Sequence, residues 1–297
     1  MTTNSIRGYA KTTEIAAEAR VGLERLCNTS KPGGITEAPS SRGIERIEAR
    51  FVGQGFEPHR HDTYALGLTL TGVQTFHYRG ASRFSMPGNI IVLHPDEVHD
   101  GAAGTERGLS YRMLYLPPER LLETSEKIRS LPFVANPVVS DESFRLCLAE
   151  ALCELECSLE DLQLDDLIGR FFESLDRHSE NRPRPSSAVA SSAVMLCRDF
   201  LRENCDRLVS SSELEAISGL DRFMLARQFR QVLGTSPHRY LLMRRLQKAK
   251  SFLSKESKLA EVAAMTGFAD QAHFTRHFKK TFGMTPGRWI QLTSMAN

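Results

Sequence analysis

The chain has 297 residues, which is enough for two domains of ordinary size that each bury a core of their own. Its hydrophobic content of 41% and charged content of 25% are typical of a globular protein, and no apolar run reaches the roughly 18 residues of a membrane span. The N-terminal sequence lacks the apolar segment of a secretory signal, so we expect a cytoplasmic protein whose six cysteines are reduced thiols.

Residues 1–43 are predicted to form an N-terminal arm, with a weak helical pattern over 11–27. After the arm, the period of the apolar residues changes to the alternation of strands, interrupted by Gly, Pro, Asn and Asp. The expected strands are 44–51, 65–71, 73–79, 89–94 and 110–116. Short strands this close together favour a β-barrel or a β-sandwich.

Histidines are concentrated in this barrel segment, which holds five of the nine in the chain. His59 and His61 alternate on a predicted strand and therefore face the same side, and His99 is placed to join them from a later strand. Three imidazole nitrogens of this kind suit zinc or iron. The sequence requires no cofactor, but a divalent metal at His59, His61 and His99 is a hypothesis that the structure can test.

The mouth of such a barrel is also a place where a small molecule can bind. The candidate effector contacts are polar and aromatic side chains of the barrel segment: His59, His61, Tyr64, Tyr78, His99 and Arg112. Two alternatives stay open. The histidines can be structural hydrogen-bonding groups, and the pocket can be filled by the barrel's own side chains.

Residues of about 118–178 are predicted to form a pair of helices. Leucines at 148, 152, 155, 159 and 162 repeat at heptad spacing, and a second apolar stripe at 164, 168, 171 and 175 would fold back beside the first. Antiparallel helices of this kind can form a homodimer, or they can pack on their own barrel. Both interpretations are compatible with the pattern.

The charge of the chain changes sign at a linker over 181–187, NRPRPSS. Residues 188–297 carry a net charge of +8, from 17 Lys and Arg against 9 Asp and Glu, and the remainder carries −6, from 21 against 27. A concentration of positive charge favours contact with a phosphate backbone whatever the base sequence. The C-terminal part is therefore the candidate for binding double-stranded DNA.

One pattern occurs twice in the C-terminal part, at offsets of 48 and 49 residues. Gly219 and Gly267 suit the left-handed position that ends a helix, and Asp221 and Asp270 can cap the helix that follows. The pattern predicts two helix-turn-helix units at about 211–233 and 259–282, joined by a helix over 237–252. A small helical bundle without DNA-binding function would need the same glycines and apolar spacing.

The residues left on the outer faces of the two second helices suit the edges of DNA bases and the phosphates. Arginine can bridge guanine, glutamine can bridge adenine, and small or apolar side chains can meet a thymine methyl group. The candidate DNA-binding residues are Arg222, Phe223, Ala226, Arg227, Arg230, Gln271, Ala272, His273, Thr275, Arg276 and Lys279. Arg230 and Lys279 lie farther along their helices and are assigned to phosphate.

The segment GFADQAHFTRHFKKTFGMTPGRW, residues 267–289, resembles the second helix-turn-helix unit of the AraC/XylS regulators, and SGLDRFMLARQFRQVLGTSPHRYL resembles their first unit. The motifs PHRHDTY, from Pro58, and MPGNIIVLHPDEVH, from Met86, resemble the cupin-like sensor domain of the same family. The resemblance implies base reading by Phe223, Ala226 and Arg227 in the first unit and by Gln271, Ala272, Thr275 and Arg276 in the second. It also implies an effector in the barrel, a homodimer and contact with RNA polymerase.

The sequence as a whole predicts an α+β multidomain protein. A cupin-like β-barrel with a helical linker or dimerisation region occupies 44–182, and an all-α double helix-turn-helix domain occupies 188–297. We expect a sequence-specific DNA-binding transcription regulator, an activator that answers to a small-molecule effector, and not an enzyme. The alternatives are a cupin-type metal-dependent enzyme that carries a DNA-binding tail and an architectural DNA binder without an effector. Cupin enzymes place a glutamate shortly after the His-x-His pair, where this chain has Ala65 and Leu66.

Overall fold

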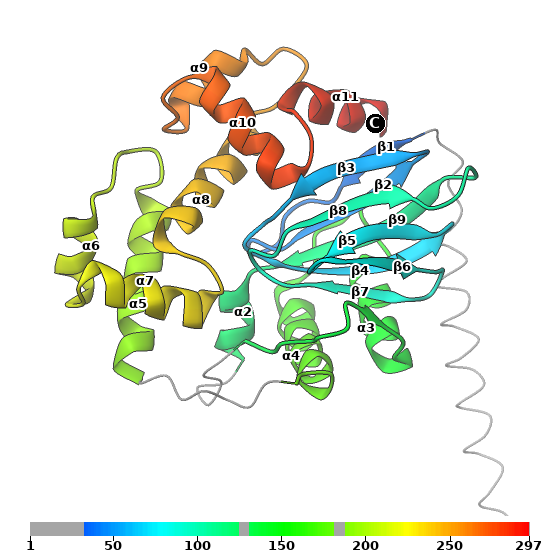
Figure 1. Ribbon diagram of the computed structural model, residues 1–297, viewed down its shortest axis with the longest axis horizontal. Coiled ribbons are helices and arrows are strands. Elements are labelled where there is room, and N and C mark those ends of the chain that lie inside the picture. Colours follow the sequence, from blue (N-terminus) through cyan, green and yellow to red (C-terminus); the bar gives the residue numbers. More distant parts are fainter. Residues whose placement is uncertain (1–32, 125–130, 181–187, 297) are drawn as a thin grey trace, which may run out of the picture.

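The computed structural model describes residues 33–124, 131–180 and 188–296 (Figure 1). The helical pattern at 11–27 and the linker at 181–187 lie outside the described residues. Within the described residues, a β domain of two sheets with helices on one face is followed by a helical domain that curves over one end of the sheets. No helix in these ranges is both long and apolar enough to cross a membrane.

The β domain consists of two antiparallel sheets that share one core. The larger sheet has the strand order β1 (Gly34–Glu37), β2 (Glu45–Phe51), β9 (Leu109–Leu116), β4 (Tyr64–Thr71), β7 (Ile90–Leu93), β10 (Val138–Val139). The smaller sheet has the order β3 (Gln54–His59), β8 (His99–Ala103), β5 (Gln74–Tyr78), β6 (Ala81–Ser85).

The five predicted strands are confirmed as β2, β4, β5, β7 and β9, and each boundary differs by at most one residue. The predicted arm is partly wrong, because its residues 34–37 form β1 and pair with β2 at the edge of the larger sheet. The expected strands did not include β3, β6, β8 or β10. The pairing of β3 with β8 shifts register twice, so its side chains follow no simple alternation. The expectation that His59 and His61 alternate on one strand is wrong, because β3 ends at His59.

The alternation of side chains divides the larger sheet into two faces. On β4 and β9, odd-numbered residues such as Ala65 and Met113 face the core between the sheets. Even-numbered residues such as Leu66 and Leu114 face the covering helices α2 (Pro118–Glu123), α3 (Glu142–Leu152) and α4 (Asp161–Arg177). This parity decides which side chains can reach the interior.

The predicted heptad seam is wrong, because α3 ends at Leu152 and the chain is not helical again until Asp161. Two buried arginines of the sheet bind the carbonyl groups at this helix end. Arg46 donates to Ala151 O and Glu154 O, both at 3.0 Å, and Arg112 donates to Cys153 O at 2.9 Å. The second stripe is buried against the sheet, so the helices pack on their own β domain and this stripe is not a free dimer surface.

The helical domain contains two helix-turn-helix units. Its helices are α5 (Ala188–Glu203), α6 (Ser211–Ser218), α7 (Arg222–Leu233), α8 (Pro237–Ser251), α9 (Leu259–Met265), α10 (Gln271–Phe282) and α11 (Pro286–Ala296). Helices α6 and α7 form the first unit, α9 and α10 form the second, and α8 connects them (Figure 1). Asp221 accepts hydrogen bonds from the first turn of α7, and Asp270 does so for α10, as the sequence predicted.

Candidate nucleic-acid interface and domain joint

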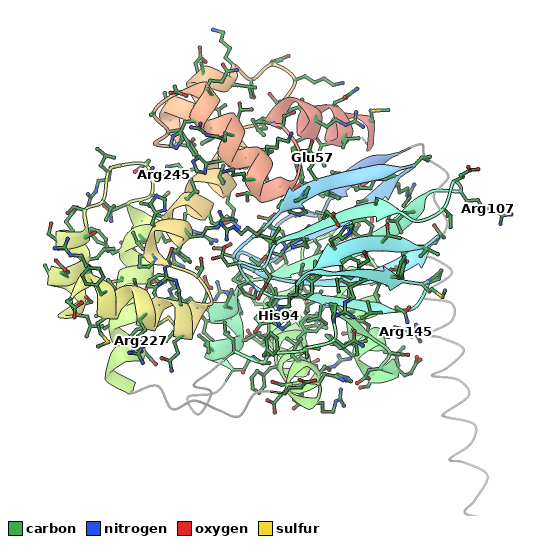
Figure 2. All side chains as sticks on the ribbon, viewed as in Figure 1. Glu57, His94, Arg107, Arg145, Arg227 and Arg245 are labelled. Atoms are coloured by element: carbon green, nitrogen blue, oxygen red, sulfur yellow. The ribbon has the colours of Figure 1, made fainter. Side chains whose placement is uncertain are left out.

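Helix α7 presents an exposed face built from the predicted residues. Leu225 and Phe229 are buried and hold the helix in place. Arg222, Phe223 and Arg227 are exposed, and Phe223 is 80% exposed although it is a large apolar residue. Arg227 lies on α7, far from the end of the β domain that carries Glu57 (Figure 2). An exposed phenyl ring one turn before an exposed arginine is suited to the edges of bases.

Helix α10 repeats this arrangement. Phe274 and Phe278 are fully buried, and Gln271, Ala272 and Arg276 are exposed at the start and middle of the helix. The half-buried His273 is partly engaged, since its ring lies edge-on to His277 at 4.5 Å between centroids. His273 is therefore less available to a base than its neighbours, whereas the half-buried Thr275 lies between the exposed residues.

The far end of α10 contacts the β domain. Lys279 Nζ lies 2.7 Å from Glu57 Oε2, and Glu57 N donates to Gly283 O at 3.0 Å. Gly283 has φ +69°, and a Cβ there would lie 2.9 Å from both Glu57 O and His59 Nδ1. A glycine is therefore needed for the turn and for the close approach. Glu57 lies on β3, at the side of the smaller sheet that meets α10 (Figure 2).

The turn after α7 also contacts the β domain. Gly234 has φ +74°, and a Cβ there would lie 3.1 Å from Pro95 and 3.4 Å from Leu131. The two glycines that end α7 and α10 therefore both rest on the β domain. This arrangement ties the positions of the two units to one surface.

Ion pairs along α8 complete this contact, which we call the joint. Arg239 pairs with Asp96 at 3.0 Å, and Arg244 pairs with the buried Asp62 at 2.7 Å. Lys250 lies 2.6 Å from both Glu37 and Glu45. Its ammonium group also lies 4.6 Å from the ring centre of Trp289, the single tryptophan of the chain. The joint is defined by Glu37, Glu45, Glu57, Asp62 and Asp96 of the β domain and Arg239, Arg244, Lys250, Lys279 and Gly283 of the helical domain.

The three predicted histidines do come together, at the joint rather than in an open barrel mouth. The ring centre of His99 lies 4.3 Å from that of His59 and 4.8 Å from that of His61. Each Nδ1 meets a backbone carbonyl oxygen, that of Glu57, Thr63 or Glu97, at 2.8–3.0 Å. Burial lowers the pKa of all three to about 3, so the imidazoles are neutral at pH 7.

The metal hypothesis is not supported by this geometry. Within residues 33–124, 131–180 and 188–296, no group of three or more His, Cys, Asp or Glu side chains is arranged to hold a metal ion. His59, His61 and His99 are packed ring against ring, and the Nδ1 atom of each is tied to a backbone carbonyl oxygen. We therefore assign these histidines to the joint.

A small cavity lies inside the joint. It measures about 30 Å³ and is lined by both domains, with His59, His61 and Tyr115 on one side and Met243 and Lys250 on the other. Two buried polar atoms beside it, His61 Nε2 and Asp62 Oδ1, have no hydrogen-bond partner. Such orphaned groups mark a place where a ligand or water can bind.

The remaining predicted effector residues do not line this cavity. Tyr64 and Arg112 have even numbers on β4 and β9 and therefore face the helices. Tyr64 donates to Pro132 O at 2.6 Å, and Arg112 pairs with Glu48 at 2.7 Å. Tyr78 reaches the core, but its hydroxyl contacts His94 Nδ1 at 2.8 Å, and burial raises its pKa to about 12. Sequence analysis missed Asp62, Tyr115, Met243 and Lys250, which approach only in the folded chain.

The comparisons with known proteins agree with this two-domain arrangement. The model of the AraC-like ligand binding domain matches residues 42–194, and that of a helix-turn-helix domain matches 214–291. The HTH-type transcriptional regulator YbfI of Bacillus subtilis is 27% identical over 243 residues, which cover 77% of this chain and 85% of YbfI. The transcriptional activator RhaS of Yersinia pestis is 23% identical over 83% of this chain and 93% of its own length.

Solved structures share the fold. A structure of ToxT from Vibrio cholerae has a TM-score of 0.63 at 14% identity and covers 84% of this chain and 98% of its own. Another ToxT structure, with an unsaturated fatty acid bound, has a TM-score of 0.60 at 12% identity and covers 89% of this chain and 97% of its own.

Proposed function

The chain belongs to the AraC family of transcription regulators, and we propose that it reads promoter DNA with α7 and α10 under the control of a small molecule that binds at the joint. The observation that carries the DNA part is the pair of capped helices whose outer faces are exposed beside fully buried aromatic cores.

Arg227 and Arg276 are the proposed guanine readers, and Gln271 is the proposed adenine reader. Phe223, Ala226, Ala272 and Thr275 are proposed to meet thymine methyl groups or leave room for them. Arg222, Arg230, His273 and Lys279 are proposed to support the backbone contact.

Substitution of the two basic residues on α10 separates base reading from phosphate contact. Arg276→Ala is expected to lower the affinity for the operator by about 1–3 kcal/mol and to relax preference at one base pair. Lys279→Ala is expected to weaken specific and random DNA alike. Electrophoretic titration against the operator and a scrambled duplex measures both effects. Equal losses on both duplexes for Arg276→Ala would remove the base-reading role of Arg276.

The effector is proposed to act by separating the two domains. The joint cavity, at about 30 Å³, has room for a water molecule or two and not for a metabolite. A molecule that satisfies His61 Nε2 and Asp62 Oδ1 must therefore favour a state in which α8 and α10 have moved away from the β domain. A ligand shifts an equilibrium only by its difference in affinity for the two states, and here the closed state offers it almost no room.

Glu57→Gln tests whether the joint competes with DNA for Lys279. The variant is expected to bind operator and random DNA more tightly by up to about 1 kcal/mol, because an exposed ion pair of this kind is worth no more than that. The slope of log affinity against log salt should steepen by about 0.9, the value for one additional phosphate contact. The matched control is Glu57→Gln in a Lys279→Ala background, where neither change is expected. An unchanged salt slope in the single variant would contradict the competition.

Assembly and activation are further parts of the proposal. We propose that the regulator acts as a homodimer and contacts RNA polymerase at its promoters, in line with the family to which it belongs. Because the apolar stripes of α3 and α4 are buried against the sheet, a dimer has to use another face. Sedimentation with and without operator DNA tests the dimer, and transcription in a purified system tests activation. The enzyme alternative predicts stoichiometric metal and turnover, and elemental analysis of the purified protein tests it.

A further inference from the structure

A hollow in the first helix-turn-helix unit shares part of its rim with the proposed DNA face, but its apolar floor has no part in the function proposed so far. It measures about 330 Å³ and lies between α5, α6, α7 and the start of α8. This volume is at the lower end of the range of roughly 300–1,000 Å³ for small-molecule pockets, and it is about ten times that of the joint cavity. The apolar floor is lined by the buried Leu201, Leu214, Leu225 and Leu241 and by the half-buried Val209.

The rim of the hollow is positive. Arg222, Arg230 and His238 line it, and no Asp or Glu side chain does. Arg222 also pairs with Glu215 at 3.2 Å, whereas the hydrogen bond of Arg230 goes to a backbone carbonyl oxygen. The capping residues Ser210 of α6 and Ser236 of α8 also line the hollow. The Glu213 carboxylate accepts hydrogen bonds from Ser210 and offsets the dipole of α6, whereas the dipole of α8 adds positive potential. The rim therefore attracts an anion.

The aliphatic floor distinguishes this site from a simple phosphate contact. A phosphate group needs hydrogen-bond donors, and five aliphatic side chains supply none. A DNA backbone resting on the rim would leave the floor uncovered. An apolar group that enters the hollow removes its own surface and that of the floor from water.

We propose that this hollow binds a small organic anion with an apolar body, such as a medium-chain carboxylate, and that the bound anion excludes DNA from α7. The carboxylate lies at the rim near Arg222, Arg230 and His238, and the apolar body lies on the leucines. Competition follows because Ala226 and Arg230 line the hollow and also belong to the proposed DNA face. The competition between the anion and DNA rests on the proposed function, whereas binding of the anion in the hollow does not.

Binding is tested with octanoate on the full-length protein labelled at Leu, Val and Met methyl groups. Octanoate is expected to shift the methyl resonances of Leu201, Leu214 and Leu241. Octanol, which keeps the apolar body, is expected to bind about tenfold more weakly, because it loses a charge-assisted contact. Sulfate, which keeps the charge, is expected to leave the leucine methyl groups unshifted. Equal binding of octanol and octanoate, or shifts confined to Met243 and its neighbours at the joint, would overturn the proposal.

Two variants test the hollow separately from the DNA face, since Val209 and His238 line the hollow but are not among the proposed DNA-binding residues. Val209→Phe fills the hollow, and His238→Glu places a negative charge at one point of the rim. Val209→Phe is expected to bind operator DNA within twofold of the wild type without a probe, and both variants are expected to lose at least about tenfold in octanoate affinity. His238→Glu should leave octanol binding unchanged, and it carries the test alone if Val209→Phe does not fold. Octanoate that binds both variants as it binds the wild type would show that the hollow is not its site. If the chain binds no DNA, the methyl shifts still test the hollow by itself.

Discussion

Asp62→Ala is expected to destabilise the joint by about 3–5 kcal/mol, because it leaves the guanidinium of Arg244 buried without its counter-charge. Asp62 is 2% exposed and the side chain of Arg244 is 12% exposed, so water cannot replace the lost partner. Burial disfavours the charged form of Arg244, but the attractions of Asp62, Tyr240 and Glu119 together outweigh burial and raise its pKa. Burial in turn raises the pKa of Asp62 against the attraction of Arg244.

Trp289 reports the loss of the joint directly. It is the single tryptophan, it is 5% exposed, and it lies against Lys250 at the joint. Its fluorescence in a urea titration is expected to change at a much lower urea concentration in Asp62→Ala than in the wild type. A double variant, Asp62→Leu with Arg244→Met, is expected to recover most of the loss, because no unpaired charge is then buried.

A surface pair supplies the control for the joint experiment. Lys258 and Glu261 pair at 3.0 Å, and both side chains are more than 60% exposed, so Glu261→Ala is expected to cost less than about 1 kcal/mol. An Asp62→Ala variant that unfolds within 1 kcal/mol of the wild type would mean that water reaches Arg244 and that the joint is looser than described.

The helical domain could be predicted because its signals are local. Asp221 and Asp270 cap the helices that follow within a few residues, and Gly234 and Gly283 end them with positive φ. Each of these features depends only on neighbours in the sequence, so the repeated pattern specified both units. The five expected strands could be predicted for the same reason, because alternation of apolar and polar residues is also a local signal. Strand β3 could not be predicted, because its bulges break the alternation.

The joint could not be predicted, because its contacts join residues far apart in the chain. Asp62 and Arg244 are 182 positions apart, and Glu45 and Lys250 are 205 positions apart. In isolation, Arg244 and Lys250 indicate only a basic helix. Arg112 was assigned to the pocket from its residue type, although its parity on β9 matches that of Leu114 and Leu116 and places it on the helix side. The heptad seam failed because Arg46 and Arg112 bind the end of α3, a contact that leucine spacing does not indicate.

Acidification from pH 7 to pH 5 is expected to open the joint, because His59, His61 and His99 are held neutral inside it. Their pKa values of about 3 lie below the ordinary value of about 6.5 for an exposed histidine, so the closed state binds fewer protons than the open one. Their contribution to stability is therefore fully present above pH 6.5 and is lost as the pH falls toward 3. At pH 5 each histidine accounts for a loss of about 2 kcal/mol.

The charged groups around the histidines modify this titration without reversing it. Arg239 on α8 opposes protonation of His61, Asp100 on β8 favours protonation of His59, and each histidine opposes protonation of another. Proton uptake therefore proceeds in coupled steps, and the summed loss at pH 5 is roughly 4–6 kcal/mol, comparable with the stability of a whole domain.

Trp289 fluorescence in urea, recorded from pH 7.5 to pH 5, measures this loss. His61→Gln and His99→Gln are each expected to make the urea midpoint of the Trp289 transition depend less on pH, because an amide takes up no proton. His238→Gln is the matched control, since His238 is exposed and lines the hollow of the first helix-turn-helix unit and not the joint cavity. The pH dependence of its unfolding midpoint in urea is expected to equal that of the wild type. His94 has a buried ring with a pKa of about 3 as well, and it adds to the pH dependence of the β domain's stability. This contribution is the same in all of these variants. If the urea midpoint falls with pH as steeply in both His61→Gln and His99→Gln as in the wild type, the joint does not open by protonation of these histidines.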